Sequence, residues 1–398
     1  MLKDLSLNAS RASRELPRVT SSALADEIEK LRAAGREVLT LAGAPYWPPP
    51  EHVLRAAAEA ASRNENAPSR GFLELRAAIA RKLESEGVPV NPQTEILISN
   101  GAMHALSLLF TTLLNPGDEV VLFKPSFFFF GVIRLAGGVP VYAETRQEEE
   151  WRWDCDALES AITPRTRIIL LNAPMNPTGY VPGNEDLLRI ASIAQRHDLI
   201  VASDECYDNM LYDGGRHIRV ASLPELRDRT ITICSFTKTL AMQPWRIGFL
   251  AGPADMIAAL QKTLEWTLLR CSHVAQRAAQ AALEGPQEWV GEIARRFQRG
   301  RDLMMDGLKP ATSLSFVRPK AAPFLFVNVG QTGMTGNEFS RLLLRNYGVP
   351  TDDGAFFGSD RHVRLLFGAP DEIIQAAAKR IAQACNECSE SNVKLSSH

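Results

Sequence analysis

The feature that most constrains this fold is an alternation of helix-periodic segments with short apolar runs. The runs are rich in Val, Ile and Leu and are bounded by Gly, Pro, Asn or Asp, which predicts buried strands. They are Glu95–Ser99, Glu119–Phe123, Arg167–Asn172, Leu199–Asp204, Thr230–Ser235 and Ile247–Ala251. Helix-periodic segments lie among them, at Gly71–Glu86, Ala102–Leu114, Glu185–His197 and Pro253–Trp266. This alternation predicts an α/β fold with a mostly parallel sheet covered by helices on both faces.

The chain has 398 residues, more than one compact core usually supports, so we expect two domains. The Pro-rich segment Leu41–Pro50 predicts an extended loop after an N-terminal helical arm. Past residue 310, short apolar runs suggest a smaller α+β domain. The predicted division is an arm and part of the small domain at 1–44, a large domain at 45–287, and the small C-terminal domain at 288–398.

Composition argues against several classes of function. With 44 basic and 46 acidic side chains, the chain has no basic surplus for nucleic acid or an anionic membrane. It has no apolar run of about 18 residues, and its N-terminus is polar, so neither membrane insertion nor export is indicated. Six sparse cysteines make the cytoplasm the expected location. We interpret the Cys385–Cys388 pair as incidental and, because the histidines are dispersed, predict no metal site.

Four of the predicted strands are followed directly by polar or reactive side chains. Sheets of this kind bind ligands beyond the carboxyl ends of their strands. The segments that follow the strands are Asn100–Met103, Ala173–Gly179, Asp204–Tyr207 and Ser235–Lys238. We therefore expect a ligand site at this edge of the sheet.

Four motifs carry a resemblance to a known family. They are NAPMNPTG at Asn172–Gly179, DECY at Asp204–Tyr207, SFTKTLAMQPWRIGF at Ser235–Phe249 and HVRLLF at His362–Phe367. In this order and spacing, over nearly the whole chain, they resemble the class I/II aminotransferases, which are pyridoxal 5'-phosphate enzymes of fold type I. The resemblance implies this cofactor, a homodimer with sites at the subunit interface, and an amino acid and a 2-oxo acid as substrates.

The resemblance assigns catalytic roles to residues that suit the chemistry. Lys238, at a strand-to-helix turn, would hold the cofactor aldehyde as a Schiff base and then move the proton. Asp204 would keep the ring nitrogen of the cofactor protonated. Tyr207 and Asn176 match residues that hydrogen-bond the phenolic oxygen of the cofactor. The alternatives are a surface lysine, a capping aspartate and, for Asn176, a purely local turn.

The remaining cofactor contacts follow in the same way. A phosphate needs N–H donors at a helix start and a cation, which Gly101, Ala102 and Arg246 would supply. The other assigned cofactor-binding residues are Met103, Phe127, Ser235 and Thr237. Gly101 could instead form an ordinary turn, Ser235 could cap a helix, and Arg246 could be a surface charge. Phe127 lies among four consecutive phenylalanines, so core packing is its alternative, and we expect at least one of the four to flank the ligand.

Substrate capture requires a clamp for the α-carboxylate, which suits a guanidinium group. Arg364 matches the family arginine, and Asn176 and the backbone of Gly43 are the expected helpers. An exposed arginine on a strand is the alternative for Arg364. No basic residue can be assigned from the sequence to a distal carboxylate of the substrate.

The chain also departs from the family pattern near the expected site. Asn66 replaces a tyrosine that reaches the phosphate of the neighbouring subunit, and Tyr46 and Trp47, expected at the site entrance, follow an altered Gly-Glu-Pro-Asp motif. The other departures are Pro244, Ala321 and Leu366. The departures at Asn66, Tyr46 and Ala321 leave open a second outcome, which is elimination, replacement or cyclisation of an amino acid in specialised metabolism. A sensor domain fused to a DNA-binding module is disfavoured, because only about 40 residues precede the Pro-rich loop.

Overall fold

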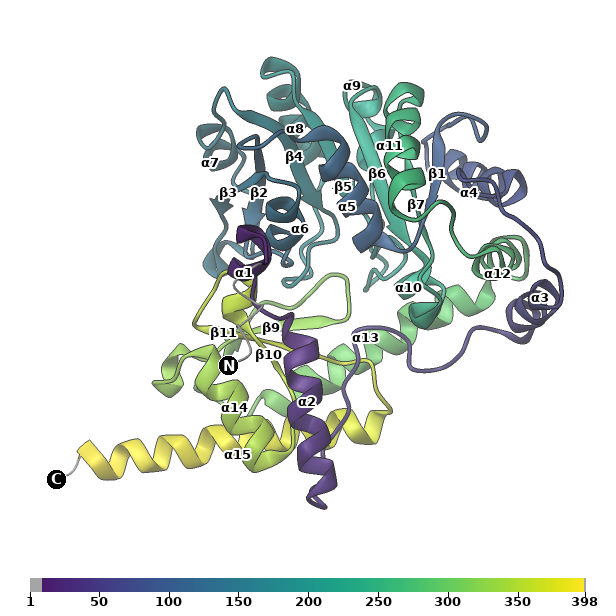
Figure 1. Ribbon diagram of the computed structural model, residues 1–398. Helices are drawn as coiled ribbons and strands as arrows, with labels where there is room; N and C mark the ends of the chain where they lie inside the picture. The colour runs from purple at the N-terminus through teal and green to yellow at the C-terminus, as the bar shows by residue number, and fades with distance from the viewer. Residues whose placement is uncertain (1–8, 397–398) are drawn as a thin grey trace, which may run out of the picture.

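A computed structural model describes residues 9–396, and for residues 20–23 and 388–396 it describes the backbone alone. A seven-stranded sheet with helices on both faces forms the larger part, and a four-stranded antiparallel sheet forms a smaller domain beside it (Figure 1). The predicted α/β fold class is confirmed. The residue boundaries that we assigned to the two domains stay a prediction.

The large sheet has the strand order β1-β7-β6-β5-β4-β2-β3. Its strands are β1 (Ile96–Ser99), β2 (Glu119–Lys124), β3 (Val139–Glu144), β4 (Thr166–Asn172), β5 (Ile200–Asp204), β6 (Thr230–Ser235) and β7 (Gly248–Ala251). Neighbouring strands are parallel except at β7, which is antiparallel to both β6 and β1. The six predicted strands are all present, within two residues at each end. The sequence analysis missed β3, which forms the edge of the sheet.

Alternate residues of the strands pack into two separate hydrophobic cores, one on each face of the large sheet. Val120 and Leu122 of β2 belong to one core, whereas Val121 and Phe123 belong to the other. This alternation follows from the two-residue period of a strand, and it explains why these strands are apolar throughout. The first core includes residues of α4, α5, α11 and α12, and the second includes residues of α7 and α8.

The helices fill the intervals between the strands, as the periodicity predicts. In the first half of the chain they are α1 (Arg11–Glu15), α2 (Thr20–Ala33), α3 (Glu51–Ala61), α4 (Leu73–Ser85), α5 (Ala102–Leu113), α6 (Phe130–Leu135), α7 (Cys155–Ser160) and α8 (Asn184–Arg196). In the second half they are α9 (Pro224–Arg227), α10 (Phe236–Thr239), α11 (Ala254–Thr267), α12 (His273–Glu284), α13 (Glu288–Leu308), α14 (Gly336–Tyr347) and α15 (Asp371–Ser396).

The smaller sheet has the order β10-β11-β9-β8, and α13, α14 and α15 contribute to the core that it covers. Its strands are β8 (Ser315–Phe316), β9 (Phe324–Asn328), β10 (Asp352–Asp353) and β11 (His362–Leu366). Figure 1 shows α13 running between the two sheets, with α2 from the N-terminal part alongside the small domain. The long helix α13 has 21 residues and begins at Glu288.

Among the described residues, no helix is both long and apolar enough to cross a membrane. In the same part of the chain, no group of three or more His, Cys, Asp or Glu side chains is placed to hold a metal ion. Cys385 is buried in the small-domain core, and the side chain of Cys388 lies outside the described residues.

Candidate active site

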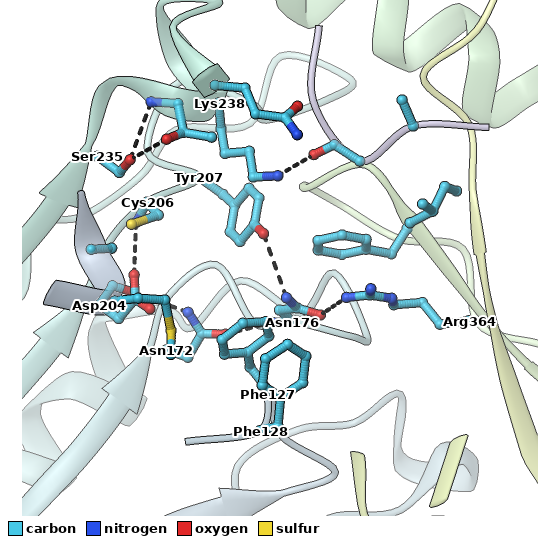
Figure 2. Close-up of a pocket in the computed structure, with 18 of the residues that line it drawn as sticks. Phe127, Phe128, Asn172, Asn176, Asp204, Cys206, Tyr207, Ser235, Lys238 and Arg364 are labelled. Carbon is cyan, nitrogen blue, oxygen red and sulfur yellow. Dashed lines mark hydrogen bonds between the residues drawn. The ribbon is translucent and has the colours of Figure 1, made fainter. Parts of the chain in front are cut away.

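A cavity of about 470 Å³ lies at the carboxyl ends of the large-sheet strands and reaches the small domain (Figure 2). It brings together side chains from β5, β6, β11 and the loops that follow the strands. The predicted site residues that line it are Gly43, Ala102, Met103, Phe127, Asn176, Asp204, Tyr207, Ser235, Thr237, Lys238, Arg246 and Arg364. Gly101, the remaining predicted residue, immediately precedes the helix α5 that borders the cavity.

Lys238 enters the cavity from the short helix α10, which follows β6 directly. Its Nζ atom donates a hydrogen bond to the carbonyl oxygen of Gly43 over 2.7 Å (Figure 2). Desolvation in the cavity, together with the positive charge of Arg364, lowers the pKa of Lys238 to about 8. Near pH 7 about a tenth of the lysine is therefore the neutral, nucleophilic amine, far more than at the ordinary lysine pKa of about 10.4.

Asp204 is the last residue of β5, and its carboxyl group is buried. The backbone N–H of Cys206 donates to Oδ1 over 3.2 Å, but no described residue forms an ion pair with this carboxyl group. Burial therefore raises the pKa of Asp204 to about 6. A cation bound against Asp204 would offset this cost of desolvation.

Tyr207, Asn176 and Arg364 form a hydrogen-bonded row across the cavity (Figure 2). The Asn176 amide donates to the Tyr207 hydroxyl over 3.5 Å, and Arg364 Nη1 donates to Asn176 Oδ1 over 2.9 Å. Asp352 Oδ2 accepts from Nε and Nη2 of Arg364 at 3.1 and 2.6 Å. Arg364 is thus a positioned, partly buried cation rather than a freely exposed one.

The start of α5 forms a cradle for an anion. Gly101 has a φ of 80°, and a Cβ atom built on it would lie 2.6 Å from Arg246 Nη2, so a larger residue would collide with the guanidinium group. The first N–H groups of a helix have no acceptor within the helix. Arg246 also donates to the Thr237 hydroxyl over 3.4 Å, and Ser235 accepts from the Thr237 N–H. Donors and a cation therefore converge here.

The four consecutive phenylalanines divide between the cavity and the core. Phe127 and Phe128 line the cavity, opposite Lys238 in Figure 2, with their ring centroids 3.8 Å apart. Phe129 is buried in the large-domain core, and Phe130 begins α6 beside Arg134. Phe127 and Phe128 therefore remain the candidates for the side chain that we expect to flank the ligand.

Two groups of residues were not placed correctly by sequence reasoning. Tyr46 and Trp47 do not line the site cavity, and instead border a separate cavity of about 380 Å³, where Trp47 stacks under Arg296. In contrast, Asn172 and Asp352 were missed. Asn172 Oδ1 accepts from the Asn176 N–H over 2.7 Å. Its own amide donates to the carbonyl oxygen of Asp204, so it ties the two strand ends together.

A buried network of charges lies beneath the loop that carries Asp204 and Tyr207. Glu205 accepts from Arg219 over 2.9 Å and pairs with His217 over 2.7 Å, and Arg219 also pairs with Asp208. Lys82 of α4 lies 3.0 Å from Asp208. Burial alone would raise the pKa of Glu205, but Arg219 and His217 hold it below its ordinary value. These ion pairs fasten the loop to the large domain.

Comparison with known proteins decides the family. The family described as Aminotransferase class I and II matches residues 37–381. The chain belongs to this family. It is 34% identical to the aspartate aminotransferase of Geobacillus stearothermophilus, over 90% of this chain and 94% of that protein. It is 35% identical to the aromatic-amino-acid aminotransferase 2 of Thermococcus litoralis, over 87% of this chain and 90% of that protein.

Solved structures agree with the assignment to the aminotransferases. The Thermus thermophilus aspartate aminotransferase with maleate has a TM-score of 0.89 and 33% identity, covering 94% of this chain and 99% of that chain. The aromatic aminotransferase from Pyrococcus horikoshii has a TM-score of 0.85 and 34% identity, covering 90% and 99%. The chain is therefore a pyridoxal-phosphate-dependent aminotransferase of fold type I.

The residues of the cavity fit this cofactor. The unpaired buried carboxyl group of Asp204 suits a protonated ring nitrogen, and the cradle at Gly101 suits a phosphate group. The lowered pKa of Lys238 suits a covalent bond to an aldehyde. Phe127 supplies an aromatic face along the same cavity. The ring nitrogen, the phosphate, the aldehyde and the ring face of the cofactor thus each have a matching group in this chain.

The buried network makes a prediction about stability. Arg219→Met should lower the free energy of unfolding by about 3–5 kcal/mol, because it leaves Glu205 and Asp208 buried with less compensating charge. Arg196→Met is the matched control, since its pair with Glu159 is largely exposed and should contribute less than about 1 kcal/mol. Urea denaturation of both variants measures the difference. Equal losses would show that the network does not stabilise the fold.

The pKa of Lys238 makes a second prediction. Because only the neutral amine attacks an aldehyde, the rate at which the apoprotein attaches pyridoxal phosphate should rise with pH and level off above about 8. Visible absorption follows this reaction. The reference is N-acetyl-lysine amide, whose amine has a pKa of about 10.4, so that its rate should continue to rise to higher pH. The same profile for protein and reference would contradict the lowered pKa.

Proposed function

We propose that the protein transfers an amino group from an amino acid to a 2-oxo acid, and that Lys238, Asp204 and Arg364 have separate roles in this reaction. The observation that carries this proposal is that the Lys238 amine, the Asn176–Arg364 pair and the buried Asp204 carboxyl group border one cavity. When bound, pyridoxal phosphate supplies an aldehyde that accepts the amino group and a ring that withdraws electrons from the substrate Cα.

Arg364 binds the α-carboxylate of the substrate and Asn176 orients it. The guanidinium group is held from behind by Asp352, so its direction is fixed before the substrate arrives. A planar, preorganised fork binds a carboxylate through two hydrogen bonds, which fixes the substrate in orientation as well as in position. The bond to be broken at Cα is thereby directed toward Lys238.

Lys238 moves the proton. With the cofactor bound, the free Lys238 amine would take the proton from the substrate Cα as a general base and give it back as a general acid. A pKa near 8 suits both tasks, because the group must accept and release a proton close to neutral pH. Asp204 would keep the ring nitrogen of the cofactor protonated, and Tyr207 would donate to its phenolic oxygen. Burial raises the pKa of Tyr207 far above neutral pH, so it stays a donor.

The cavity does not favour the alternative of elimination or cyclisation. Of the departures that motivated this alternative, Tyr46 and Ala321 do not line the cavity, and Asn66 occupies a position that the family resemblance assigns to the site of the neighbouring subunit. Asn66 is exposed, Tyr46 borders the neighbouring cavity, and Ala321 is buried behind the loop at Gly179. Amino transfer is therefore the function that the cavity supports best.

We also propose that the protein is a cytoplasmic homodimer. The resemblance to the family supports a dimer, and so does an exposed apolar patch at the end of α11. This patch consists of Trp266, Leu268 and Leu269, and 92% of the Trp266 surface is exposed in the single chain. Contact with a second copy would remove this surface from water. Cys155, Cys206, Cys234 and Cys271 are buried free thiols, which suits a reducing compartment.

The role of Lys238 is tested by Lys238→Ala. Loss of a positioned acid–base group should lower kcat for amino transfer by about 10²- to 10⁴-fold or more. The matched control is Lys262→Ala, an exposed lysine on α11 that should keep full activity. Oxo-acid formation and ammonia release are measured together. Full turnover by Lys238→Ala would refute the assigned role, and stoichiometric ammonia from the unaltered enzyme would favour elimination.

The dimer is tested by Trp266→Arg. Because a charged group would replace the exposed indole, this variant should sediment as a single chain at concentrations where the unaltered protein sediments as two. Leu188→Arg on α8 is the control, since Leu188 is also exposed but lies outside the patch. Sedimentation equilibrium measures both. A Trp266→Arg dimer as tight as the control would place the contact elsewhere.

A further inference from the structure

The basic side chains that line the site cavity are all engaged in other contacts. Among the described residues that line the cavity, the basic ones are Lys238, Arg246 and Arg364. Lys238 donates to Gly43, Arg246 lies over the start of α5, and Arg364 is held between Asp352 and Asn176. A carboxylate at the far end of a substrate would therefore meet no basic side chain from this chain.

Apolar side chains surround the carboxylate clamp instead. Leu366 lies two residues beyond Arg364 on β11, so both side chains are on the same face of the strand. Phe324 on β9 is the register partner of Leu366, and its ring centroid lies 4.7 Å from the guanidinium carbon of Arg364. Leu366 Cδ2 lies 3.4 Å from a Cβ position built on Gly43. An apolar wall thus stands beside the clamp.

A second cavity of about 480 Å³ lies behind this wall. It is lined by α2, the segment from Val38 to Leu41 and the loop before β10, and most of its lining is apolar, with Glu29, Arg32 and Asp352 as its charged residues. Leu41 and Leu366 line both this cavity and the site cavity. These two leucines, which we call the partition, therefore separate the carboxylate clamp from an apolar space large enough for several more carbon atoms.

We propose that the partition sets the length of the substrate side chain, and that the amino donors of this enzyme carry apolar rather than acidic side chains. This inference rests on the proposed amino transfer, since Arg364 must hold the α-carboxylate for the side chain to point at the partition. A side chain is desolvated against Phe324, Leu41 and Leu366 up to the partition, and each added methylene contributes about fourfold in affinity until it reaches the leucines.

The test uses straight-chain 2-amino acids of increasing length with the holoenzyme. For the unaltered enzyme, kcat/KM should rise about fourfold per methylene and then stop rising at the length that meets the partition. In Leu366→Ala, kcat/KM should continue to rise for at least two further carbons. For the longest substrate, kcat/KM should be about tenfold or more higher than in the unaltered enzyme. Leu366→Phe should shorten the optimum, and Leu41→Ala provides a second opening should Leu366→Ala fold poorly.

Leu303→Ala is the matched control, because Leu303 lines a different cavity between α13 and α15. It should leave the length profile unchanged. Calorimetric titration with straight-chain monocarboxylates provides a readout that does not depend on turnover. Leu366→Ala should bind the longest carboxylate about tenfold or more tightly than the unaltered enzyme does.

The outcomes distinguish this inference from the proposed function. If no amino acid is converted but Leu366→Ala binds longer monocarboxylates than the unaltered enzyme does, the proposed amino transfer is wrong and the proposed role of the partition is supported. If amino acids react but the length profile is the same in every variant, the partition is wrong and amino transfer stands. If aspartate or glutamate reacts faster than the apolar substrates of similar size, the proposed donor class is overturned.

Discussion

Burial of ionisable groups at the carboxyl edge of the large sheet is the interaction on which the site depends. It acts in opposite directions on two groups, lowering the pKa of Lys238 to about 8 and raising that of Asp204 to about 6. The first shift makes the amine reactive, and the second leaves a carboxyl group in need of a cation. Both shifts arise from burial, so the chemistry of the site requires the surrounding protein to keep water away from these two groups.

Such burial is costly, and the surrounding structure offsets that cost with paired charges. Glu205 and Asp208 flank the catalytic loop, and both are matched by the fully buried Arg219. Asp352 has the same relation to Arg364 in the small domain. Asp204 can remain without an ion pair because separate, buried ion pairs hold the loop that follows it in place. The geometry of the site therefore depends on residues that never touch the substrate.

The sequence predicted most of the large domain, because buried strands and amphipathic helices leave periodic patterns. It missed β3, in which Ala143 alone is buried and which includes Pro140, as an edge strand permits. It also missed β10, since two residues carry no period, and with it Asp352. The predicted strand ends do converge on one cavity. However, the position of Tyr46 and Trp47 depends on how the N-terminal loop packs against α13, which spacing in the sequence cannot indicate.

The residues on the substrate side of the cavity were also not predictable from their spacing in the sequence. Leu41 and Leu366 are more than three hundred residues apart, yet they belong to one partition because Ala42 pairs with Gly368 in an isolated bridge. The motifs that hold the cofactor follow strands of one sheet, so their order along the chain already implies their convergence. The residues that we propose to face the substrate side chain come instead from the N-terminal segment and the small domain. Relatives can therefore share the cofactor motifs and still differ in substrate, because the two sets of residues lie on different parts of the fold.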